Sequence, residues 1–219
     1  MTVEPQIHID VWSDYVCPFC YLEVPVLDRL QEAFGPALQI HWRAFELRPE
    51  PVPTLDPAGD YLKTTWARSV YPMAERRGMI LHLPPVQPHS RKAFEAAAHA
   101  RDEGKFDPMH RAIFRAFFEE GRNIGQMEIL LEIAASAGIK EEPLRRALET
   151  GRYTEPVLED ERLAQALGIS AVPTMLLRRR DAALSDATAV RGALAYEQVH
   201  AVVENLLRGE EPFMTASEE

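Results

Sequence analysis

The chain has 219 residues, of which 46% are hydrophobic and 26% are charged, and its formal net charge at pH 7 is -10. This composition is typical of a soluble globular protein, and the length suffices for one large domain or two small ones. An acidic surface repels phosphate backbones, which argues against a nucleic-acid partner. No window holds the roughly 18 uninterrupted apolar residues of a membrane span, so we expect no membrane partner.

The first five residues, MTVEP, contain neither a basic region nor a long apolar stretch, so we expect no secretion signal. Cys17 and Cys20 are the only cysteines, which leaves none for other disulfides. A chain without structural disulfides is usual in a reducing compartment. Both observations predict a cytoplasmic protein.

The first segments of the chain predict a strand, a helix and a second strand. Residues 6–13 predict a strand, with Ile7, Ile9 and Val11 on one face and the even-numbered residues on the other. Pro18 suits the first position of a helix, where its missing N–H is not needed, and helical periodicity continues until Gly35. Residues 38–45 alternate again. This order predicts a βαβ unit with parallel strands.

The middle of the chain is predicted to be helical after a proline-rich loop over residues 48–58. The dipeptide Asp107-Pro108 indicates a helix start, with a capping carboxylate followed by a proline in the first turn. The apolar periodicity predicts helices at 59–77, 90–104, 108–120, 125–137 and 141–150.

Strands return in the last third of the chain. Basic residues 178–180 are expected at a solvated strand end. The pattern predicts a helix at 154–167 that ends at Gly168, strands at 171–177 and 189–191, and a closing helix at 196–208. We therefore expect two subdomains of an α/β protein with a cleft between them.

The two cysteines form the motif Cys17-Pro18-Phe19-Cys20 between the first strand and the first helix. A C-x-x-C pair in this context predicts a redox site, because two thiols on one helical turn can close and reopen a disulfide ring. The helix N-terminus favours a thiolate on Cys17, the expected nucleophile, and Cys20 is the expected resolving thiol. The predicted cycle passes through a mixed disulfide with the substrate.

Zinc binding is the alternative use of the pair. Two cysteines supply only half of a four-ligand site, and none of the seven histidines lies at finger-like spacing. We therefore expect neither a metal nor another cofactor.

A second feature lies far from the cysteines in sequence. The segment from Gly168 to Thr174 contains Val172-Pro173 at the start of an apolar strand. Proline has no backbone N–H to donate to the sheet ladder, so it is tolerated at the start of a strand but not in its interior. Taken alone, this pattern predicts an ordinary trans proline.

The chain resembles the thioredoxin superfamily and, within it, the DsbA branch. The resemblance rests on residues 12–20, on residues 168–174 and on the helical block between them. Together with residues 191–193, these segments look most like the cytosolic FrnE-type subgroup. The resemblance implies a thioredoxin-like α/β fold with an all-helical insertion between the βαβ and ββα halves. The expected divisions are 1–55 for the N-terminal half, 56–151 for the insertion and 152–219 for the C-terminal half.

The same resemblance implies how the site is built. The Val172–Pro173 bond is expected to be cis, with Pro173 facing the cysteines and the backbone of Val172 pairing with an extended client segment. Thioredoxin-like proteins also keep a buried acid under the active-site helix as a proton acceptor. Asp10 is the nearest candidate here, although its spacing to Cys17 differs by one residue. The alternative is that Asp10 is a hydrogen-bonded strand residue.

Strongly oxidising members of the resembled family carry a histidine where this chain has Phe19. Phenylalanine supplies neither a charge nor a hydrogen bond to the thiolate, so we expect a less oxidising pair. Phe19 also adds an apolar rim that suits unfolded or hydrophobic clients.

These observations predict a cytosolic thiol–disulfide oxidoreductase that reduces or isomerises protein disulfides through Cys17 and Cys20. Its expected partners are proteins with disulfides or thiols, and glutathione or a thioredoxin-type reductant. One alternative is an enzyme like glutathione transferase kappa or 2-hydroxychromene-2-carboxylate isomerase, a group that uses a serine where Cys17 stands. The other is a holdase for unfolded chains that performs no catalysis.

Overall fold

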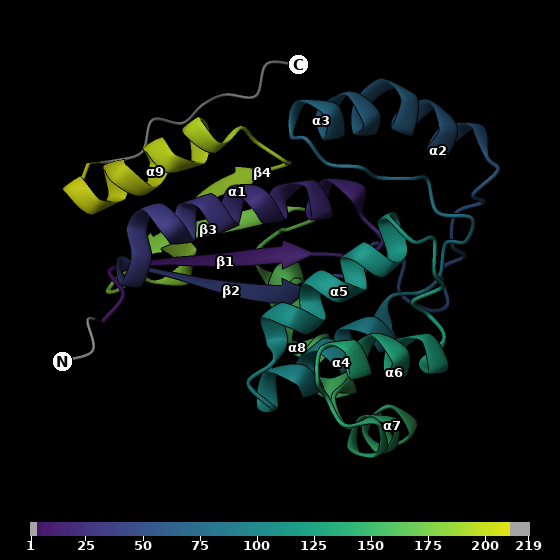
Figure 1. The fold of residues 1–219 in the computed structure, drawn as a ribbon. Coiled ribbons are helices and arrows are strands. Elements are labelled where there is room, and N and C mark those ends of the chain that lie inside the picture. Colours follow the sequence, from purple (N-terminus) through teal and green to yellow (C-terminus); the bar gives the residue numbers. More distant parts are fainter. Residues whose placement is uncertain (1–3, 211–219) are drawn as a thin grey trace.

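A computed structural model describes residues 4–210, and within this range the strands form one four-stranded sheet of order β2-β1-β3-β4 (Figure 1). The parallel pairing of β1 with β2 confirms the predicted βαβ unit. β3 lies antiparallel to β1 and to β4. The strands are β1 (Ile7–Ser13), β2 (Leu38–Ala44), β3 (Thr174–Arg179) and β4 (Thr188–Arg191).

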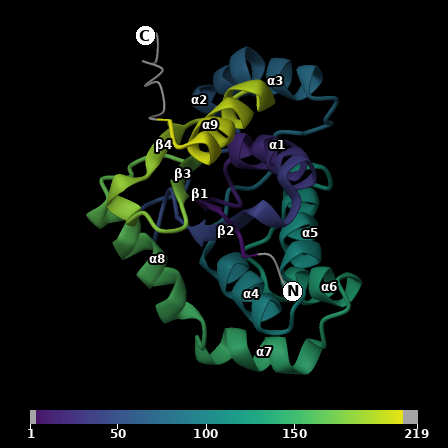
Figure 2. The same cartoon turned by 90° about the vertical axis from the view of Figure 1, so that its left-hand side faces the viewer.

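Helices cover both faces of the sheet, because residues of β1 alternate between two apolar layers. Ile9 and Val11 pack with α1 (Pro18–Phe34) and α9 (Tyr196–Arg208) on one face. Trp12 packs with α8 (Thr154–Ala166) on the opposite face. Figure 2 shows α1 and α9 together on one side of the strands and α8 on the other.

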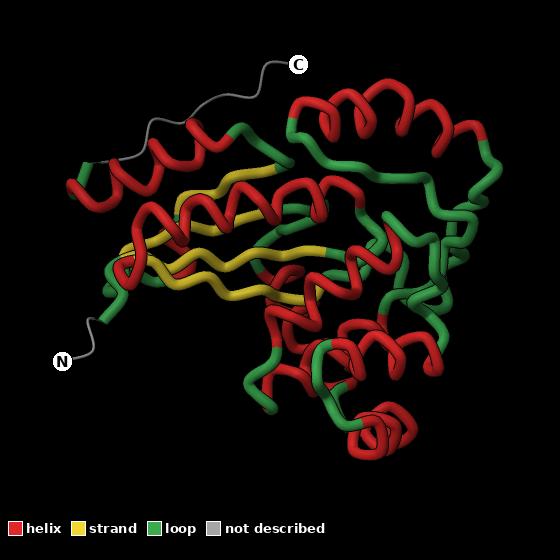
Figure 3. Tube along the Cα trace, viewed as in Figure 1, coloured by secondary structure: helices red, strands yellow, loops and turns green. Residues whose placement is uncertain are grey.

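The segment between β2 and α8 is helical, and Figure 3 shows helices and loops along its path. The apolar stripe of α5 belongs to the core, because Ile113, Phe114, Phe117 and Phe118 are fully buried. The helices are α2 (Asp60–Thr65), the π-helical turn Trp66–Val70, α3 (Tyr71–Arg76), α4 (Arg91–Asp102), α5 (Phe106–Phe118), α6 (Met127–Ser136) and α7 (Glu141–Thr150).

The helix expected at 59–77 is confirmed over residues 60–76, with a π-helical turn at Trp66–Val70 in its middle. Two predicted boundaries elsewhere were wrong. Helix α5 begins at Phe106, so Asp107 lies within its first turn and does not cap it. The strand expected at 171–177 begins only after the cis peptide bond that precedes Pro173, and continues to Arg179.

The redox end of α1 lies against the inserted helices. Cys20, Leu22 and Val24 belong to one apolar cluster with Trp66 and Phe114 from the insertion. The start of α1 therefore packs against the inserted helices, and the remainder of the helix packs against the sheet. The domain boundaries at 55/56 and 151/152 stay predictions.

Among the helices of residues 4–210, none combines the length and apolarity needed to cross a membrane.

Gly35 adopts a φ of 52° directly after α1, a conformation that favours glycine. The predicted end of this helix is therefore confirmed.

Candidate redox site

Cys17 and Cys20 lie at the start of α1, directly beyond the end of β1. Cys17 is the N-cap residue with extended backbone angles, and Pro18 is the first helical residue. The backbone N–H of Cys20 donates to the Cys17 carbonyl oxygen at 3.1 Å, which closes the first turn. Both cysteines are free thiols in this structure. The arrangement places one thiol at the helix terminus and the other one turn further in.

The two thiols differ in their surroundings. Cys17 is 5% exposed and Cys20 is fully buried. Burial raises the pKa of Cys20 well above its usual value, and a hydrogen bond with Cys17 adds to this shift. The backbone N–H of Asp14 donates to Cys20 Sγ at 3.4 Å. Cys20 therefore remains a protonated, internally held thiol near neutral pH.

Val172 and Pro173 lie beside the redox motif although they are distant in sequence. The Val172–Pro173 peptide bond is cis, which differs from the ordinary trans proline and agrees with the family resemblance. Cys17 Sγ lies 3.6 Å from the Val172 carbonyl oxygen, a contact between residues 155 positions apart. The Pro173 carbonyl oxygen accepts a hydrogen bond at 2.8 Å from the N–H of Gly192. This bond ties the proline loop to the segment that leads into α9.

An apolar groove of about 210 Å³ adjoins Cys17. Phe19 lines it from α1, and the opposite wall comes from the loop after β2 and from α2. Leu55, Tyr61 and Trp66 supply much of that wall. A groove of this composition can hold an apolar side chain next to the outer thiol.

Asp14 is a buried acid in the turn between β1 and the redox motif, and the sequence reasoning missed it. Its Oδ2 accepts the N–H of Leu47 at 2.7 Å, and its Oδ1 accepts the N–H of Val16 at 3.2 Å. Burial raises the pKa of Asp14 to about 6. Asp14 could have been found from the sequence, because it directly follows a predicted strand and stands three residues before Cys17.

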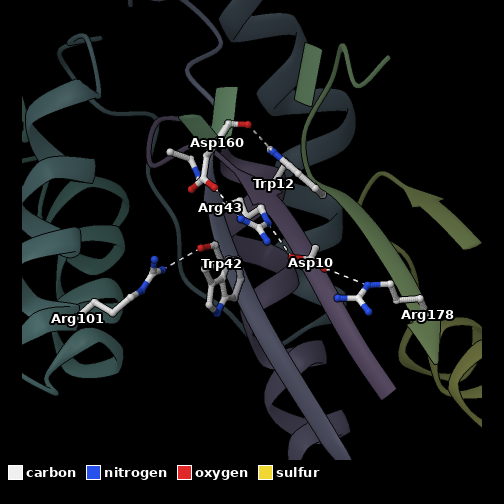
Figure 4. Close-up of polar contacts among 8 residues, drawn as sticks. Asp10, Trp12, Trp42, Arg43, Arg101, Asp160 and Arg178 are labelled. Atoms are coloured by element: carbon white, nitrogen blue, oxygen red, sulfur yellow. Dashed lines mark hydrogen bonds and ion pairs between the residues drawn. The ribbon is translucent and has the colours of Figure 1, made fainter. Parts of the chain in front are cut away.

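Asp10, the acid favoured from the sequence, has a different environment. Its Oδ1 accepts a hydrogen bond from Arg43 Nε at 2.7 Å, and Arg178 Nε lies 3.8 Å from its Oδ2 (Figure 4). Arg43 also pairs with Asp160 of α8 at 2.9 Å. Asp10 is thus a charge-paired strand residue, which was the alternative interpretation. Arg178 is half-buried, whereas Arg179 and Arg180 are exposed, as expected for a solvated strand end.

Two further buried acids lie near the start of α1. Glu23 pairs with Arg77 at 3.1 Å, and burial raises the pKa of Glu23 to about 7. Burial also raises the pKa of Glu46 to about 8, with the neighbouring Glu161 adding to the effect. Arg91 forms ion pairs with Glu46 and with Glu161. Several buried acids with raised pKa values therefore lie near the start of α1, which carries the two cysteines.

No group of three or more His, Cys, Asp or Glu side chains placed to hold a metal ion occurs in residues 4–210.

The comparisons with known proteins agree with this geometry. A family model described as "DSBA-like thioredoxin domain" matches residues 8–204. "Uncharacterized protein YwbO" of Bacillus subtilis (strain 168) is 37% identical over 175 residues, which cover 78% of this chain and 86% of that protein.

Two solved structures share the fold at low sequence identity. "Cytosolic disulfide reductase DsbM from Pseudomonas aeruginosa" matches with a TM-score of 0.68 and 22% identity, covering 92% of this chain and 98% of that one. "2-hydroxychromene-2-carboxylate isomerase" matches with a TM-score of 0.73 and 18% identity, covering 92% and 97%. The family model and the Bacillus relative settle the resemblance seen in the sequence: this chain belongs to the family of DSBA-like thioredoxin domains.

Proposed function

We propose that this protein is a cytosolic thiol–disulfide oxidoreductase that reduces or isomerises protein disulfides. The contact of 3.6 Å between Cys17 Sγ and the Val172 carbonyl oxygen carries the proposal. It puts the outer thiol beside backbone that an extended client could pair with, and the inner thiol lies one turn away. Catalysis through Cys17 and Cys20 explains why both features occur at one point.

In the proposed cycle, the Cys17 thiolate attacks a client disulfide and forms a mixed disulfide, and the second client sulfur leaves as a thiolate that takes up a proton. Cys20 then loses its proton and attacks Cys17 Sγ, which releases the first client sulfur as a thiol. The client gains two electrons and the protein gains a Cys17–Cys20 disulfide. Isomerisation differs only in that a client thiol, in place of Cys20, attacks the mixed disulfide.

Asp14 is the residue that we assign to accept the Cys20 proton. Cys20 is fully buried, so its deprotonation needs a base inside the protein. The backbone of Asp14 contacts Cys20 Sγ, and the carboxyl group has a pKa of about 6, which matches proton transfer near neutral pH. Asp10 is engaged by Arg43 and is not assigned this role.

Substrate binding is assigned to Phe19, Val172 and Pro173. The Val172 backbone would pair with an extended client strand, and cis Pro173 fixes that backbone beside Cys17. Phe19 forms one side of the apolar groove and would contact a hydrophobic client side chain. These contacts favour unfolded or partly folded proteins, whose apolar segments are exposed.

Glutathione is the reductant that we propose for the oxidised pair, with a thioredoxin-type protein as the other candidate. The cytosolic disulfide reductase with the same fold has also been solved with GSH, at a TM-score of 0.65. In a cytosolic thiol pool the pair would be held mainly reduced. This supports reduction or isomerisation over the introduction of new disulfides.

Insulin reduction with glutathione as electron donor tests the proposal directly. Cys17→Ser should reduce the rate to background, because the attacking sulfur is lost. Cys20→Ser should still attack but accumulate a mixed disulfide with the client, which mass spectrometry would detect. Full activity of Cys17→Ser, or no adduct on Cys20→Ser, would rule the mechanism out.

The isomerase-like alternative draws support from the shared fold with 2-hydroxychromene-2-carboxylate isomerase. A cysteine stands at position 17, where the resembled group uses serine, and this argues against it. Glutathione-dependent turnover of a small aromatic substrate that survives Cys20→Ser would favour this alternative. Suppression of client aggregation by the Cys17→Ser/Cys20→Ser double variant would instead favour a holdase.

A further inference from the structure

A second cavity, of about 390 Å³, lies on the α8 side of β2 and is walled by α4, α5 and α8. It shares no lining residue with the groove at Cys17. Its volume falls within the range of about 300–1,000 Å³ that is typical of small-molecule sites. The proposed redox chemistry uses none of its side chains.

The lining of this cavity is strongly aromatic. Tyr15, Trp42, Phe94 and Phe106 all contribute to it. The ring centroid of Trp42 lies 4.3 Å from that of His110, and the Phe106 centroid lies 5.0 Å from the same imidazole. The aromatic side chains of the lining favour a planar, aromatic ligand over an aliphatic one.

Arg101 provides a positioned cation at the mouth of the cavity. Its Nη2 donates to the Trp42 carbonyl oxygen at 2.8 Å (Figure 4), and its Cζ lies 4.4 Å from the Phe106 ring centroid. Among the ion pairs of residues 4–210, none involves Arg101, whereas Arg43 and Asp160 neutralise each other at 2.9 Å. The guanidinium therefore keeps free N–H donors while two contacts hold it in place.

Glu159 is the remaining charged side chain of the cavity, and it lies exposed at the rim. Arg101, by contrast, is held at the mouth by the Trp42 carbonyl oxygen and the Phe106 ring. A negative group on a ligand would therefore lie near Arg101.

The floor of the cavity carries an incompletely bonded imidazole. His110 is 4% exposed, and its Nδ1 lies 2.9 Å from the Tyr15 hydroxyl, while Nε2 has no hydrogen-bond partner among the described residues. Burial lowers the pKa of His110 to about 3 and raises that of Tyr15, so both are neutral at pH 7. Donation from Tyr15 to Nδ1 leaves one unpaired N–H, whereas the reverse leaves two unpaired groups. The first arrangement is favoured, and Nε2 is then a donor.

We propose that this cavity binds a planar aromatic carboxylate. The carboxylate pairs with Arg101 at the mouth, the rings lie against Trp42 and Phe106, and an oxygen at the far end accepts from His110 Nε2. This site is independent of the redox pair.

Isothermal titration calorimetry with 6-hydroxy-2-naphthoate tests the proposal on the full-length protein. The wild type should bind this probe saturably and should bind 2-naphthol, which lacks the carboxylate, about tenfold more weakly. Arg101→Gln should weaken the carboxylate probe about tenfold and leave 2-naphthol unchanged. Arg115→Gln, an exposed arginine of α5 outside the cavity, is the matched control and should bind like the wild type.

Two further comparisons locate the probe. Phe19→Ala should retain full affinity, because Phe19 lines only the other groove. 2-Naphthoate, which lacks the far hydroxyl, should bind the wild type several-fold more weakly, and His110→Phe should remove this difference. Absence of saturable binding, or equal binding by Arg101→Gln and Arg115→Gln, would overturn the site. An unaltered preference for the hydroxyl in His110→Phe would overturn the role of the imidazole.

Discussion

The two halves of helix α1 are built for different tasks, and Pro25 separates them. Before it, Cys20, Leu22 and Val24 pack into the apolar cluster of the inserted helices. After it, the helix packs on the sheet and α9, through Val26, Leu27 and Leu30. One helix thus belongs to two cores, each with its own partners.

The halves also differ in their titratable neighbours. Around the first half lie Asp14, Glu23 and Glu46, all buried and all with raised pKa values. The acids of the second half lie nearer the solvent: Asp28 is half-buried and pairs with Arg111, and Glu32 is exposed. Burying a carboxyl group without full compensation is unfavourable, so the proposed chemistry sits where the fold tolerates destabilising groups. Substitutions in the two halves should therefore affect different properties.

The sharpest test of this comparison pairs one substitution from each half. Cys17→Ser should abolish insulin reduction and leave the free energy of unfolding nearly unchanged, because one atom at a helix terminus changes. Leu30→Ala should lower the free energy of unfolding by about 2–5 kcal/mol through a buried cavity, yet keep its activity below the melting temperature. Chemical denaturation and an insulin assay on both variants measure this. Loss of both properties in either variant would contradict the division.

A second prediction concerns the ion pair between Arg77 and Glu23. Arg77→Met should leave the Glu23 carboxylate buried without its partner, which lowers the free energy of unfolding by about 3 kcal/mol at pH 8. At pH 5 the loss should be smaller, because Glu23, with a pKa of about 7, then carries a proton. Urea denaturation at both pH values gives the two numbers.

The control for this prediction is the Arg77→Met/Glu23→Gln double variant, which removes the charge that Arg77 neutralised. It should recover much of the stability at pH 8. Arg77 also donates to the carbonyl oxygens of Leu22 and Leu194, and the loss of those bonds is independent of pH. An equal loss at pH 5 and pH 8 would show that the carbonyl contacts dominate.

A third prediction uses the raised pKa of Asp14. The folded-state value of about 6 exceeds the ordinary 3.8, so the folded protein binds the proton more tightly than the unfolded chain. The resulting stabilisation is fully present below about pH 4 and is lost as the pH rises through about 6. A shift of about two units at about 1.4 kcal/mol each corresponds to about 3 kcal/mol. The free energy of unfolding, measured between pH 4 and pH 8, should therefore fall with pH.

Asp14→Asn should make this slope shallower between pH 4 and pH 6, because the asparagine does not titrate while Glu23 and Glu46 still do. Glu149→Gln is a suitable control, since Glu149 lies on the exposed surface of α7. A slope in Asp14→Asn that equals the wild-type slope would assign the pH dependence to the other buried acids alone.

Local sequence patterns were enough to predict the strand and the helix that each pack in simple layers. The closing helix was predicted at 196–208 and occupies Tyr196–Arg208, because its apolar stripe faces a single layer. The alternation in β1 predicted its two faces for the same reason. Periodicity also predicted the helical range 59–77, but it did not show the π-helical turn at Trp66–Val70 within it.

Features set by distant partners were not accessible from the sequence. Asp10 and Asp14 are both acids near Cys17, and their spacing alone does not show that Arg43 and Arg178 approach Asp10 from two other strands. The groove at Cys17 depends on the path of the loop after β2, which packing determines. The proximity of Val172 to Cys17 was expected only through the family resemblance, since no local pattern connects residues 155 positions apart.

The smallest predicted effect concerns Phe19, at the start of α1. Phe19→Ala should slow the reduction of an unfolded client about fivefold, which corresponds to about 1 kcal/mol of lost apolar contact in the groove. The reaction with a small disulfide such as oxidised glutathione should be nearly unchanged, because a small disulfide does not fill the groove. Phe34→Ala, at the other end of the same helix, is the matched control and should leave both rates unaltered. An equal slowing of both substrates by Phe19→Ala would mean that Phe19 acts on the thiols themselves and that the groove does not select the client.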